Sequence, residues 1–461
     1  MSSPLETYQL PSSPTFTCID RFSLHPDPNV VEDANGQVPF WPILSSVLSL
    51  SITSAASLID VLETISTTLI GTTAPANDHL LLRNVLEESP DFFPVVWPCV
   101  AKLALEMQVL FPDGHIPVLG RKMNEIRLSR RQVACLVAHQ FLRTLRAPSW
   151  RDDGMHDFGI WYSMEQRQES AAKAYLLALM VYFREVVAKL EGERGWKLVF
   201  TLRSLKVEDL SDDGEECPLA EIEVEIVAEY NTLPRSLGLP GGAAVVAANK
   251  LVGFGQSATQ EEVHVGISPE ACPAVLMTPI LDHDQALVVQ GAQAMINITG
   301  KRRAIGAAAT EAPEDGDGNW EERRMLFMDA LELDLDSNSA GLPDLQPGNV
   351  DREIGKAYTA FCSGGFREVR TGLWGCGAFG ADPVVKVLIL WFAASLAGIK
   401  LTVVCDEEIR PVAEQLGVII SAVKRRLQNA AAIRRLLKDG PQGLRTHHQT
   451  ALWYKERLGA T

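Results

Sequence analysis

Two adjacent carboxylates, Glu261 and Glu262, end a segment that begins at Asn249 and contains Gly253 and Gly255. The segment follows an apolar run at 243–248, which is typical of a buried strand. Backbone N–H groups in a glycine turn after a strand can approach a phosphate closely. If the two carboxylates are buried together, one can keep a proton and act as a general acid on a glycosidic bond. The alternative is an exposed acidic pair at the end of a loop.

A second glycine loop, residues 375–380 (GCGAFG), precedes an apolar stretch at 383–397 that predicts a helix. Asp382 has the residue type of an N-cap, and Pro383 that of the first helical residue. A glycine loop that leads into a helix N-terminus is a ready site for an anion. The alternative is a tight turn whose glycines only permit close packing. Phe379 is then either a ring stacked on a ligand or a core side chain.

A competing motif overlaps the first loop, because residues 253–258 fit the dinucleotide fingerprint G-x-G-x-x-G/A. That fingerprint requires a helix to begin inside it. The residues that follow include β-branched Val263 and Val265, then Gly266 and Pro269, which predict a poor helix. A dinucleotide site is therefore disfavoured.

The elements that must position these loops change in kind along the chain. Residues 1–40 are rich in proline and predict an extended leader, and residues 41–192 predict a helical domain, most clearly at 170–190. Residues 193–461 predict an α/β domain. Its expected strands lie at 196–205, 219–227, 243–248, 274–281, 286–298, 323–333 and 400–405. Strands alternating with helices predict a mixed or largely parallel sheet flanked by helices.

Composition excludes several classes of protein. A net charge of −16 argues against a general DNA-binding surface. The eight cysteines form no C-x-x-C pair, and no zinc-ligand spacing is present, so we expect reduced thiols and no metal or other cofactor. The N-terminus lacks the features of a secretory signal, and no segment is typical of a membrane span. A location in the nucleus or cytoplasm is expected.

Taken together, these motifs resemble those of the poly(ADP-ribose) glycohydrolase family. That family carries an asparagine, a glycine triplet, a Gln-Glu-Glu motif and a later Gly-Cys-Gly-Ala-Phe-Gly loop. The matching positions here are Asn249, Gly253, Gly255, Gln260, Glu261, Glu262, Gly375, Cys376, Gly377, Ala378, Phe379 and Gly380. Residues 128–142, 174–186, 196–205, 319–334 and 352–361 are also similar in type and order, so the resemblance covers roughly residues 120–405.

The resemblance implies a macrodomain-like sheet with an N-terminal helical accessory domain. It also implies a metal-free enzyme that acts on poly(ADP-ribose) attached to modified proteins and releases ADP-ribose. Glu262 is the expected acid/base, and Glu261 the residue that positions substrate ribose. Asn249 is expected beside the cut bond and Gln260 near the adenine, while loop 375–380 binds the diphosphate and Phe379 packs on a ribose. No DNA or membrane partner is expected, and the chain is expected to be a monomer.

The sequence departs from the family pattern at three places. The family has an aspartate where this chain has Val246, its middle glycine is Phe254, and the spacer before Gln260 is about three residues shorter. The region 296–310 contains no tyrosine, and Lys301, Arg302 and Arg303 are either partial replacements for one or an exposed basic turn. These departures motivate an alternative function, a module that binds ADP-ribose with little or no catalysis.

Overall fold

The computed structural model describes residues 5–70, 78–187, 190, 195–205, 214–229, 231–300, 304–309, 319–335, 341–440, 443–444 and 446–459. They form two compact units, each assembled from separate parts of the chain. Unit 1 comprises Met1–Val199, Gly253–Pro279 and Gly291–Glu314, and unit 2 comprises Phe200–Val252, Ile280–Gln290 and Asp315–Thr461. Lys301, Arg302 and Arg303 lie outside the described residues. The three domain ranges expected from the sequence remain a prediction.

Unit 1 is mainly helical. Its helices are α1 (Phe40–Leu48), α2 (Ala55–Ile70), α3 (Leu80–Glu87), α4 (Trp97–Leu105), α5 (Met107–Leu110), α6 (Arg130–Phe141), α7 (Glu169–Glu185), α8 (Gln260–Gly266) and α9 (Ala274–Met277). Helix α6 begins where the sequence dictates, because Ser129 and Gln132 form a reciprocal capping box. The first residue of α6, Arg130, forms a buried ion pair with Glu270 at 2.5 Å. This pair ties the segment after α8 to the helices of the N-terminal region.

Short strands interrupt the helices of unit 1, which the sequence did not predict. They are β1 (Thr7–Gln9), β2 (Thr17–Cys18), β3 (Val38–Pro39), β4 (His115–Pro117), β5 (Glu125–Ser129), β10 (Asn297–Thr299) and β11 (Gly306–Ala309). Strand β1 pairs with β4, and β2 pairs with β3. Leu10 and Phe16 are buried, so the proline-rich leader is extended but contributes to the core.

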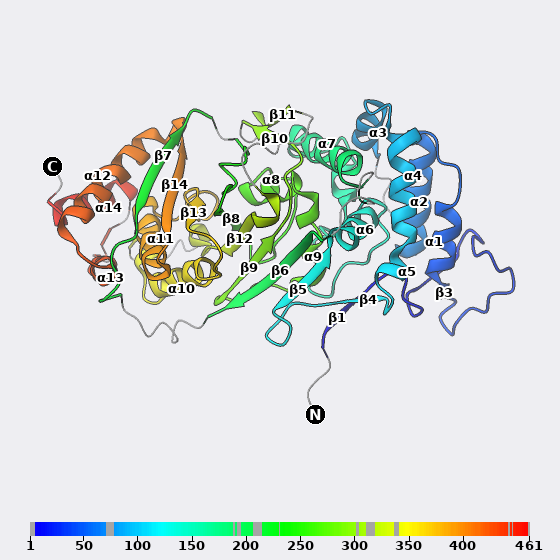
Figure 1. The fold of residues 1–461 in the computed structure, drawn as a ribbon, viewed down its shortest axis with the longest axis horizontal. Helices are drawn as coiled ribbons and strands as arrows, with labels where there is room; N and C mark the ends of the chain where they lie inside the picture. Colours follow the sequence, from blue (N-terminus) through cyan, green and yellow to red (C-terminus); the bar gives the residue numbers. More distant parts are fainter. Residues whose placement is uncertain are drawn as a thin grey trace. The chain divides into compact units, whose positions relative to one another are not determined.

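Unit 2 is built on a mixed sheet. Its strands are β6 (Lys197–Ser204, which begins in unit 1), β7 (Ile222–Val227), β8 (Gly242–Ala248), β9 (Gln285–Gln290), β12 (Arg324–Asp329), β13 (Glu368–Thr371) and β14 (Lys400–Asp406). They are ordered β6-β9-β12-β8-β13-β14-β7 (Figure 1). Strand β8 is parallel to both its neighbours, with Val245 opposite Leu326 and Ala244 opposite Arg370. Strand β9 is antiparallel to β12. The predicted mixed, largely parallel sheet is therefore confirmed.

Five helices accompany this sheet. They are α10 (Asn349–Phe361), α11 (Pro383–Ala397), α12 (Arg410–Arg426), α13 (Ala430–Lys438) and α14 (His447–Arg457). Helix α10 packs against β9 and β12, α11 against β14, and α12 against β7. Helix α11 has the bounds that the sequence predicted. In contrast, the strand expected at 274–281 is wrong, because residues 274–277 form the short helix α9.

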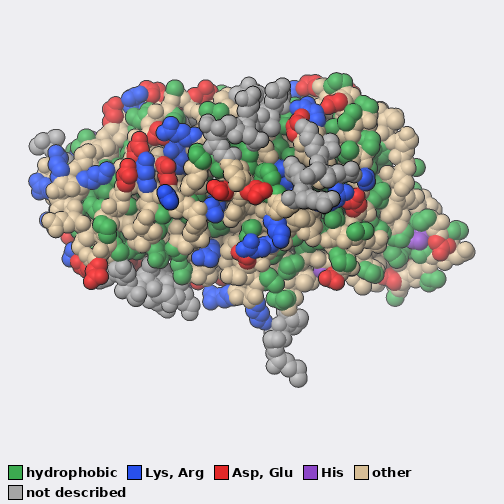
Figure 2. All heavy atoms as spheres, in the orientation of Figure 1, with side chains coloured by type: hydrophobic (Ala, Val, Ile, Leu, Met, Phe, Trp, Pro, Cys, Tyr) green, Lys and Arg blue, Asp and Glu red, His purple; other side chains and the backbone are tan. Residues whose placement is uncertain are grey.

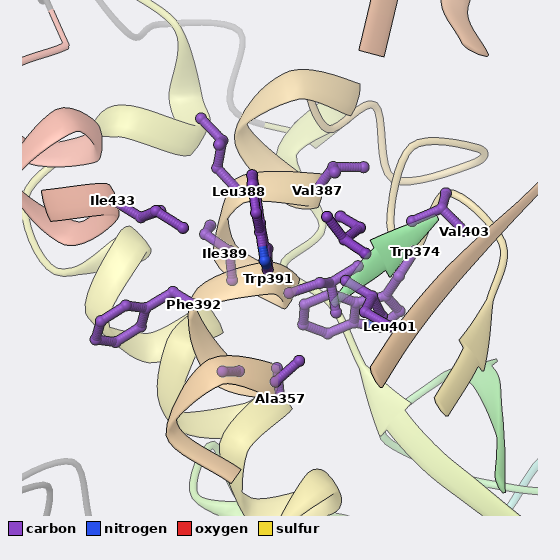
Figure 3. Close-up of a cluster of buried hydrophobic side chains, with 14 of the residues drawn as sticks. Ala357, Trp374, Val387, Leu388, Ile389, Trp391, Phe392, Leu401, Val403 and Ile433 are labelled. Atoms are coloured by element: carbon purple, nitrogen blue, oxygen red, sulfur yellow. The ribbon is translucent and has the colours of Figure 1, made fainter. Parts of the chain in front are cut away.

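A hydrophobic core of unit 2 surrounds α11, which is buried over most of its surface and is apolar apart from Lys386 and Ser395. Figure 3 shows Trp391 and Leu388 of α11 in the same buried cluster as Trp374 and Leu401 of β14. Trp374, which immediately precedes the second glycine loop, is 1% exposed and donates through Nε1 to the Met328 carbonyl at 2.9 Å. The core thus fixes the residue from which that loop departs.

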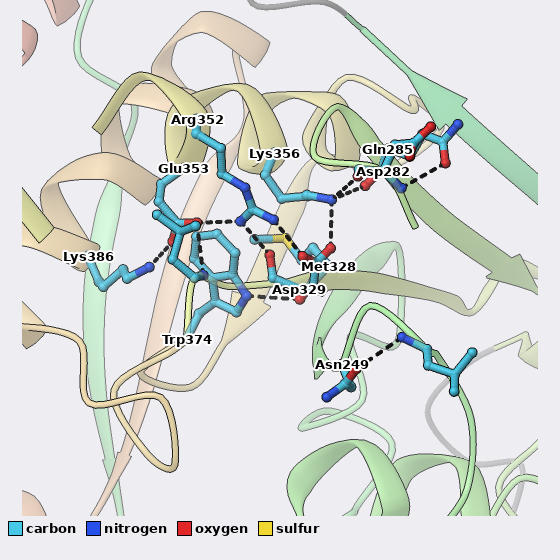
Figure 4. Close-up of polar contacts among 12 residues, drawn as sticks. Asn249, Asp282, Gln285, Met328, Asp329, Arg352, Glu353, Lys356, Trp374 and Lys386 are labelled. Carbon is cyan, nitrogen blue, oxygen red and sulfur yellow. Dashed lines mark hydrogen bonds and ion pairs between the residues drawn. The ribbon is translucent and has the colours of Figure 1, made fainter. Parts of the chain in front are cut away.

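A buried polar cluster lies beside this core (Figure 4). Lys356 donates to the carbonyls of Asp282 and Gln285 at 2.7 and 2.6 Å, and to the Asp329 carboxylate at 2.6 Å. Arg352 binds the other oxygen of Asp329. These contacts satisfy groups that would be costly to bury alone, and they join α10 to the ends of β9 and β12.

Charged side chains of both signs alternate over β7 and β14 on the face shown in Figure 2. Lys400 lies 3.0 Å from Glu223, and Arg370 lies 2.5 Å from Glu225. On this face the basic side chains near these strands are accompanied by acidic ones.

None of the helices in the described ranges is both long and apolar enough to span a bilayer.

Candidate active site

The first candidate loop leads directly into α8, although the sequence predicts a poor helix in this segment. That expectation is wrong, and the reason is local. Thr259 accepts a hydrogen bond from the Glu262 N–H, while Glu262 Oε2 accepts one from the Thr259 N–H at 3.0 Å. This capping box stabilises the first turn enough to offset the β-branched residues that follow. The T-x-x-E spacing of residues 259–262 is the sequence signal from which this helix start could have been predicted.

The two glutamates point to different partners. Glu261 is buried, at 6% exposure, and its Oε1 accepts the Gly253 N–H at 2.8 Å, so it fixes the start of the glycine loop. Glu262 is half-buried, and its Oε2 accepts the N–H groups of Ser257 and Thr259 at 2.7 and 3.0 Å. The two carboxylates are therefore not buried together, and each holds a different part of the same loop.

Gly255 is required by the position of the Glu262 carboxylate. A Cβ atom built on Gly255 would lie 2.1 Å from Glu262 Oε1, far inside van der Waals contact. The glycine therefore allows the carboxylate to lie against the backbone of the loop. Gly255 is also held from the other side, since its carbonyl accepts the Trp161 indole N–H at 2.8 Å.

Phe254 occupies the place of the family's middle glycine, and its side chain turns into the core of unit 1. The ring is 2% exposed and lies 5.4 Å from the Phe158 ring and 5.3 Å from the Trp161 ring. Tyr175 of α7 extends this aromatic cluster, with its ring 5.2 Å from Trp161. Nearby, the Gln256 amide donates to the Ile160 carbonyl. Residues 158–161, which the sequence analysis missed, therefore hold the loop, and no local pattern would have revealed this.

Asn249 and Val246 belong to unit 2 and lie on or just after β8. Asn249 follows the strand, is exposed, and accepts the Leu251 N–H through Oδ1 at 3.1 Å. Figure 4 shows it apart from the buried cluster around Asp329. Val246 is fully buried within β8, opposite Phe327 of β12. The position where the family has an aspartate is therefore part of the apolar sheet core.

The second candidate loop, residues 375–380, joins β13 to α11. Within the described residues, the N–H groups of Gly375, Gly377, Ala378 and Phe379 have no hydrogen-bond acceptor. Gly377 and Ala378 are exposed, whereas Gly375, Cys376 and Phe379 are half-buried. An exposed turn with several unused N–H groups at a helix N-terminus has the geometry that binds an anion.

Both ends of this loop are firmly held. Gly375 has a φ of +77°, and a Cβ there would lie 2.8 Å from the Ala330 Cβ, so only glycine fits without strain. At the other end Asp382 caps α11, accepting the N–H groups of Val384 and Val385 at 2.9 and 3.1 Å. Pro383 is the first helical residue, so the predicted start of α11 is confirmed.

Phe379 fits the second of the two interpretations that the sequence left open, a core side chain. The side chain is half-buried and packs against the core of unit 2. Its carbonyl accepts the N–H groups of Leu333 and Asp334 at 3.0 and 3.1 Å, which anchors the tip of the loop. Packing of its ring on a ligand ribose stays a prediction.

The predicted site residues thus form two groups, each defined within its own unit. Gly253, Gly255, Gln260, Glu261 and Glu262 lie in unit 1, on one loop and the first turn of α8. Asn249 and residues 375–379 lie in unit 2. In the parts of the chain that the structure describes, no group of three or more His, Cys, Asp or Glu side chains is arranged to hold a metal ion.

Comparison with protein families supplies two matches in the same order as these elements. Residues 238–410 match the model described as poly(ADP-ribose) glycohydrolase, macro domain fold, and residues 86–200 match the model of its helical domain. Together the two models cover more than half of the chain. The fold predicted from the sequence, a macrodomain-like sheet with an N-terminal helical domain, is confirmed.

Individual relatives carry related names. The chain is 25% identical over 315 residues to poly(ADP-ribose) glycohydrolase 1 of Caenorhabditis elegans, covering 65% of this chain and 38% of the relative. It is 28% identical over 166 residues to poly(ADP-ribose) glycohydrolase 2 of the same organism, covering 32% of this chain and 34% of the relative. The matched regions span little more than a third of the length of these relatives.

Solved structures from bacteria are more distant. The poly(ADP-ribose) glycohydrolase of Thermomonospora curvata is 16% identical, with 44% of this chain and 79% of that chain covered and a TM-score of 0.31. That of Deinococcus radiodurans, solved in complex with ADP-ribose, is 16% identical, with 49% and 94% covered and a TM-score of 0.28. These TM-scores are too low to support a common arrangement by themselves.

Proposed function

Because the chain belongs to the poly(ADP-ribose) glycohydrolase family, we propose that it hydrolyses ribose–ribose bonds in poly(ADP-ribose) and releases ADP-ribose. One observation carries the proposal. The Gln260-Glu261-Glu262 motif, which lies within the region that matches the family's macro domain, forms the first turn of α8 immediately after the glycine loop. The names of the relatives support the same substrate class.

In the proposed reaction Glu262 is the acid/base. Its carboxyl group protonates the oxygen of the leaving ribose as the glycosidic bond breaks, and the resulting carboxylate then removes a proton from the attacking water. The half-buried position of Glu262 supports this role, since the side chain is held in place while remaining accessible from solvent. Glu261 shapes the site through its bond to the Gly253 N–H and binds the substrate ribose.

The other predicted residues are proposed to bind the ligand. The unused N–H groups of residues 377–379 bind the diphosphate, and Phe379 packs on a ribose. Asn249, exposed at the end of β8, contacts the ribose beside the cut bond. Gln260 contacts the adenine. Each role comes from the matching position in the family motif.

A first prediction concerns Gly255. We expect Gly255→Ala to lower turnover about a hundredfold, because displacing a catalytic group by about an ångström has an effect of that size. The added Cβ would overlap Glu262 Oε1, so the carboxylate must move. Steady-state kinetics measures the effect, with Gly120→Ala as control, because Gly120 lies in neither candidate loop and a Cβ there meets no atom within 4 Å. Equal turnover in Gly255→Ala and wild type would contradict the prediction.

The direct test is product analysis with the purified chain. Incubation with labelled poly(ADP-ribose) on an automodified protein, followed by chromatography, should yield free ADP-ribose. Short oligomers in place of the monomer would indicate internal cleavage. Release only from a substrate carrying single ADP-ribose units would replace the proposal with a hydrolase for mono-ADP-ribose.

A second candidate function is a module that binds ADP-ribose without efficient catalysis. The burial of Val246, at the family's aspartate position, favours it, because one carboxylate of the family pattern is missing. The two functions differ in a single experiment. ADP-ribose binding without any release of product by the wild-type chain would establish the binding module.

Other expectations from the sequence remain predictions with simple tests. A monomer would be checked by light scattering, and a location in the nucleus or cytoplasm by imaging of the tagged chain. A filter-binding assay with duplex DNA would check the expected absence of direct DNA binding.

A further inference from the structure

Asp382 is the residue that joins the diphosphate loop to α11. Its Oδ1 caps the helix, and its own N–H donates to Asp344 Oδ2 at 3.0 Å. The preceding residue, Ala381, closes the loop by donating its N–H to the Gly375 carbonyl at 3.1 Å. Because Asp382 is fully buried, any shift of its side chain would move both the helix N-terminus and the loop end.

The second oxygen of Asp382 is held from far along the chain. His447 donates through Nδ1 to Asp382 Oδ2 at 2.9 Å. His447 is the first residue of α14, which lies beyond residue 410, where the match to the family models ends. Its own side chain is 59% exposed, so it reaches from the surface to a buried carboxylate. Helix α14 also contributes Tyr454, whose pKa is raised first by burial and then by the same two aspartates.

The charges around this contact favour a cation at His447. Asp344 and Asp382 place two carboxylates next to the loop that is proposed to bind a diphosphate. Their negative charges by themselves disfavour the binding of an anion there. Burial raises the pKa of Asp344 to about 6, and burial lowers the pKa of Lys386 to about 7. The hydrogen bond to Asp382 raises the pKa of His447. A protonated imidazole therefore offsets the pair of carboxylates.

We propose that His447 is a positioning residue for the diphosphate loop, fixing Asp382 and neutralising the carboxylate pair so that loop 375–380 can bind an anion. The inference rests on the proposed function, because it takes ADP-ribose as the ligand. It gives His447, the first residue of α14, which lies outside the residues that match the family models, an indirect role in binding that ligand. It also makes ligand binding dependent on the protonation of a residue that never contacts the ligand.

The sign of the pH effect follows from the raised pKa of His447. The His447–Asp382 ion pair contributes fully below the ordinary histidine pKa and is lost as the pH rises through the raised value in the folded chain. The other titratable groups near the pair are Asp344, Lys386, Cys376 and Tyr454. Because these groups are present in the wild type and in a His447 variant alike, comparing the two isolates the effect of His447.

The test is calorimetric titration of ADP-ribose into the full chain at about pH 6.5 and about pH 9, spanning the histidine range. At the lower pH, His447→Ala should weaken binding about tenfold, the size expected when a charge-assisted hydrogen bond is lost. His447→Gln, whose amide can still donate to Asp382, should recover part of the loss. Wild-type affinity should fall at the higher pH, and the affinity of His447→Gln should fall less. His448→Ala, an exposed neighbour, is the control and should match the wild type.

Three results would overturn the inference in different ways. If His447→Ala binds ADP-ribose as tightly as wild type at both pH values, the positioning role is wrong and the proposed function stands. If the wild-type chain binds no ADP-ribose, the proposed function fails and takes the inference with it. If His447→Gln folds like wild type and its ADP-ribose affinity depends on pH as the wild-type affinity does, the proposal is also contradicted. Thermal unfolding of each variant separates weaker binding from a loss of fold.

Discussion

Replacing Glu262 with glutamine should lower the release of ADP-ribose from poly(ADP-ribose) by about a thousandfold, within the range that general acid/base catalysis contributes. Glutamine has no acidic proton to give to the leaving ribose oxygen, and its amide is not basic enough to take a proton from water. The binding of ADP-ribose should be retained, because the change is nearly isosteric. Product chromatography measures turnover, and calorimetry measures binding.

The geometry at the start of α8 allows this substitution to change the acid/base group while keeping the backbone hydrogen bonds around it. Glu262 Oε2 accepts two backbone N–H groups, from Ser257 and Thr259. The amide oxygen of glutamine can accept the same two bonds, and glutamine is as suitable as glutamate at this position of a capping box. The helix start and the loop should therefore survive the change.

The matched control is Glu169→Gln, which makes the same change in the first turn of α7 at an exposed position. It should leave turnover within experimental error of wild type. Undiminished release by Glu262→Gln would remove Glu262 from the acid/base role. Simultaneous loss of binding and turnover would instead point to a wrong assignment of the site.

Replacing Phe254 with glycine should lower the free energy of unfolding by about 4 kcal/mol, the typical cost of deleting a buried aromatic ring. The ring is 2% exposed and packs against the stacked rings of Phe158 and Trp161. Glycine would leave a cavity and add backbone freedom to a loop that already contains Gly253 and Gly255. Urea unfolding followed by tryptophan fluorescence and circular dichroism measures the change.

Two further variants test the cause. Phe254→Leu keeps much of the apolar volume and should lose roughly a third as much stability. Phe22→Gly deletes a ring of the same type that is 53% exposed in the same unit, and should change stability by less than about 1 kcal/mol. Equal effects of the substitutions at positions 22 and 254 would show that the aromatic cluster does not anchor the loop.

The Phe254 experiment also bears on the departures from the family pattern. A bulky residue in a glycine loop suggested that the phosphate contacts would be redirected. The structure places the ring in the core of unit 1, so the loop backbone remains uncovered by that side chain. Val246 is different, because it lies fully buried in β8 and removes a carboxylate of the family pattern.

Several features of the fold could be predicted from local sequence because their causes are local. The alternation at 219–227 and the apolar run at 243–248 predict β7 and β8. Asp382 and Pro383 predict the start of α11, because a cap needs only a side chain and the next three residues. Errors also had local causes when a competing signal was overlooked. The β-branched residues after Glu262 predict a poor helix, but that prediction leaves out the capping box that starts α8 in the structure.

The sequence by itself determined the family, the mixed sheet, the helical first half and the chemical types of the two loops. Only the tertiary structure decided that Gly253–Pro279 packs with the helical unit and that Phe254 is buried by Phe158 and Trp161. It also decided that His447 meets Asp382, 65 residues earlier. Caps, turns and periodic patterns act over a few residues, so the sequence displays them directly. Burial and long-range ion pairs depend on which segments the folded chain brings together, and no single segment contains that information.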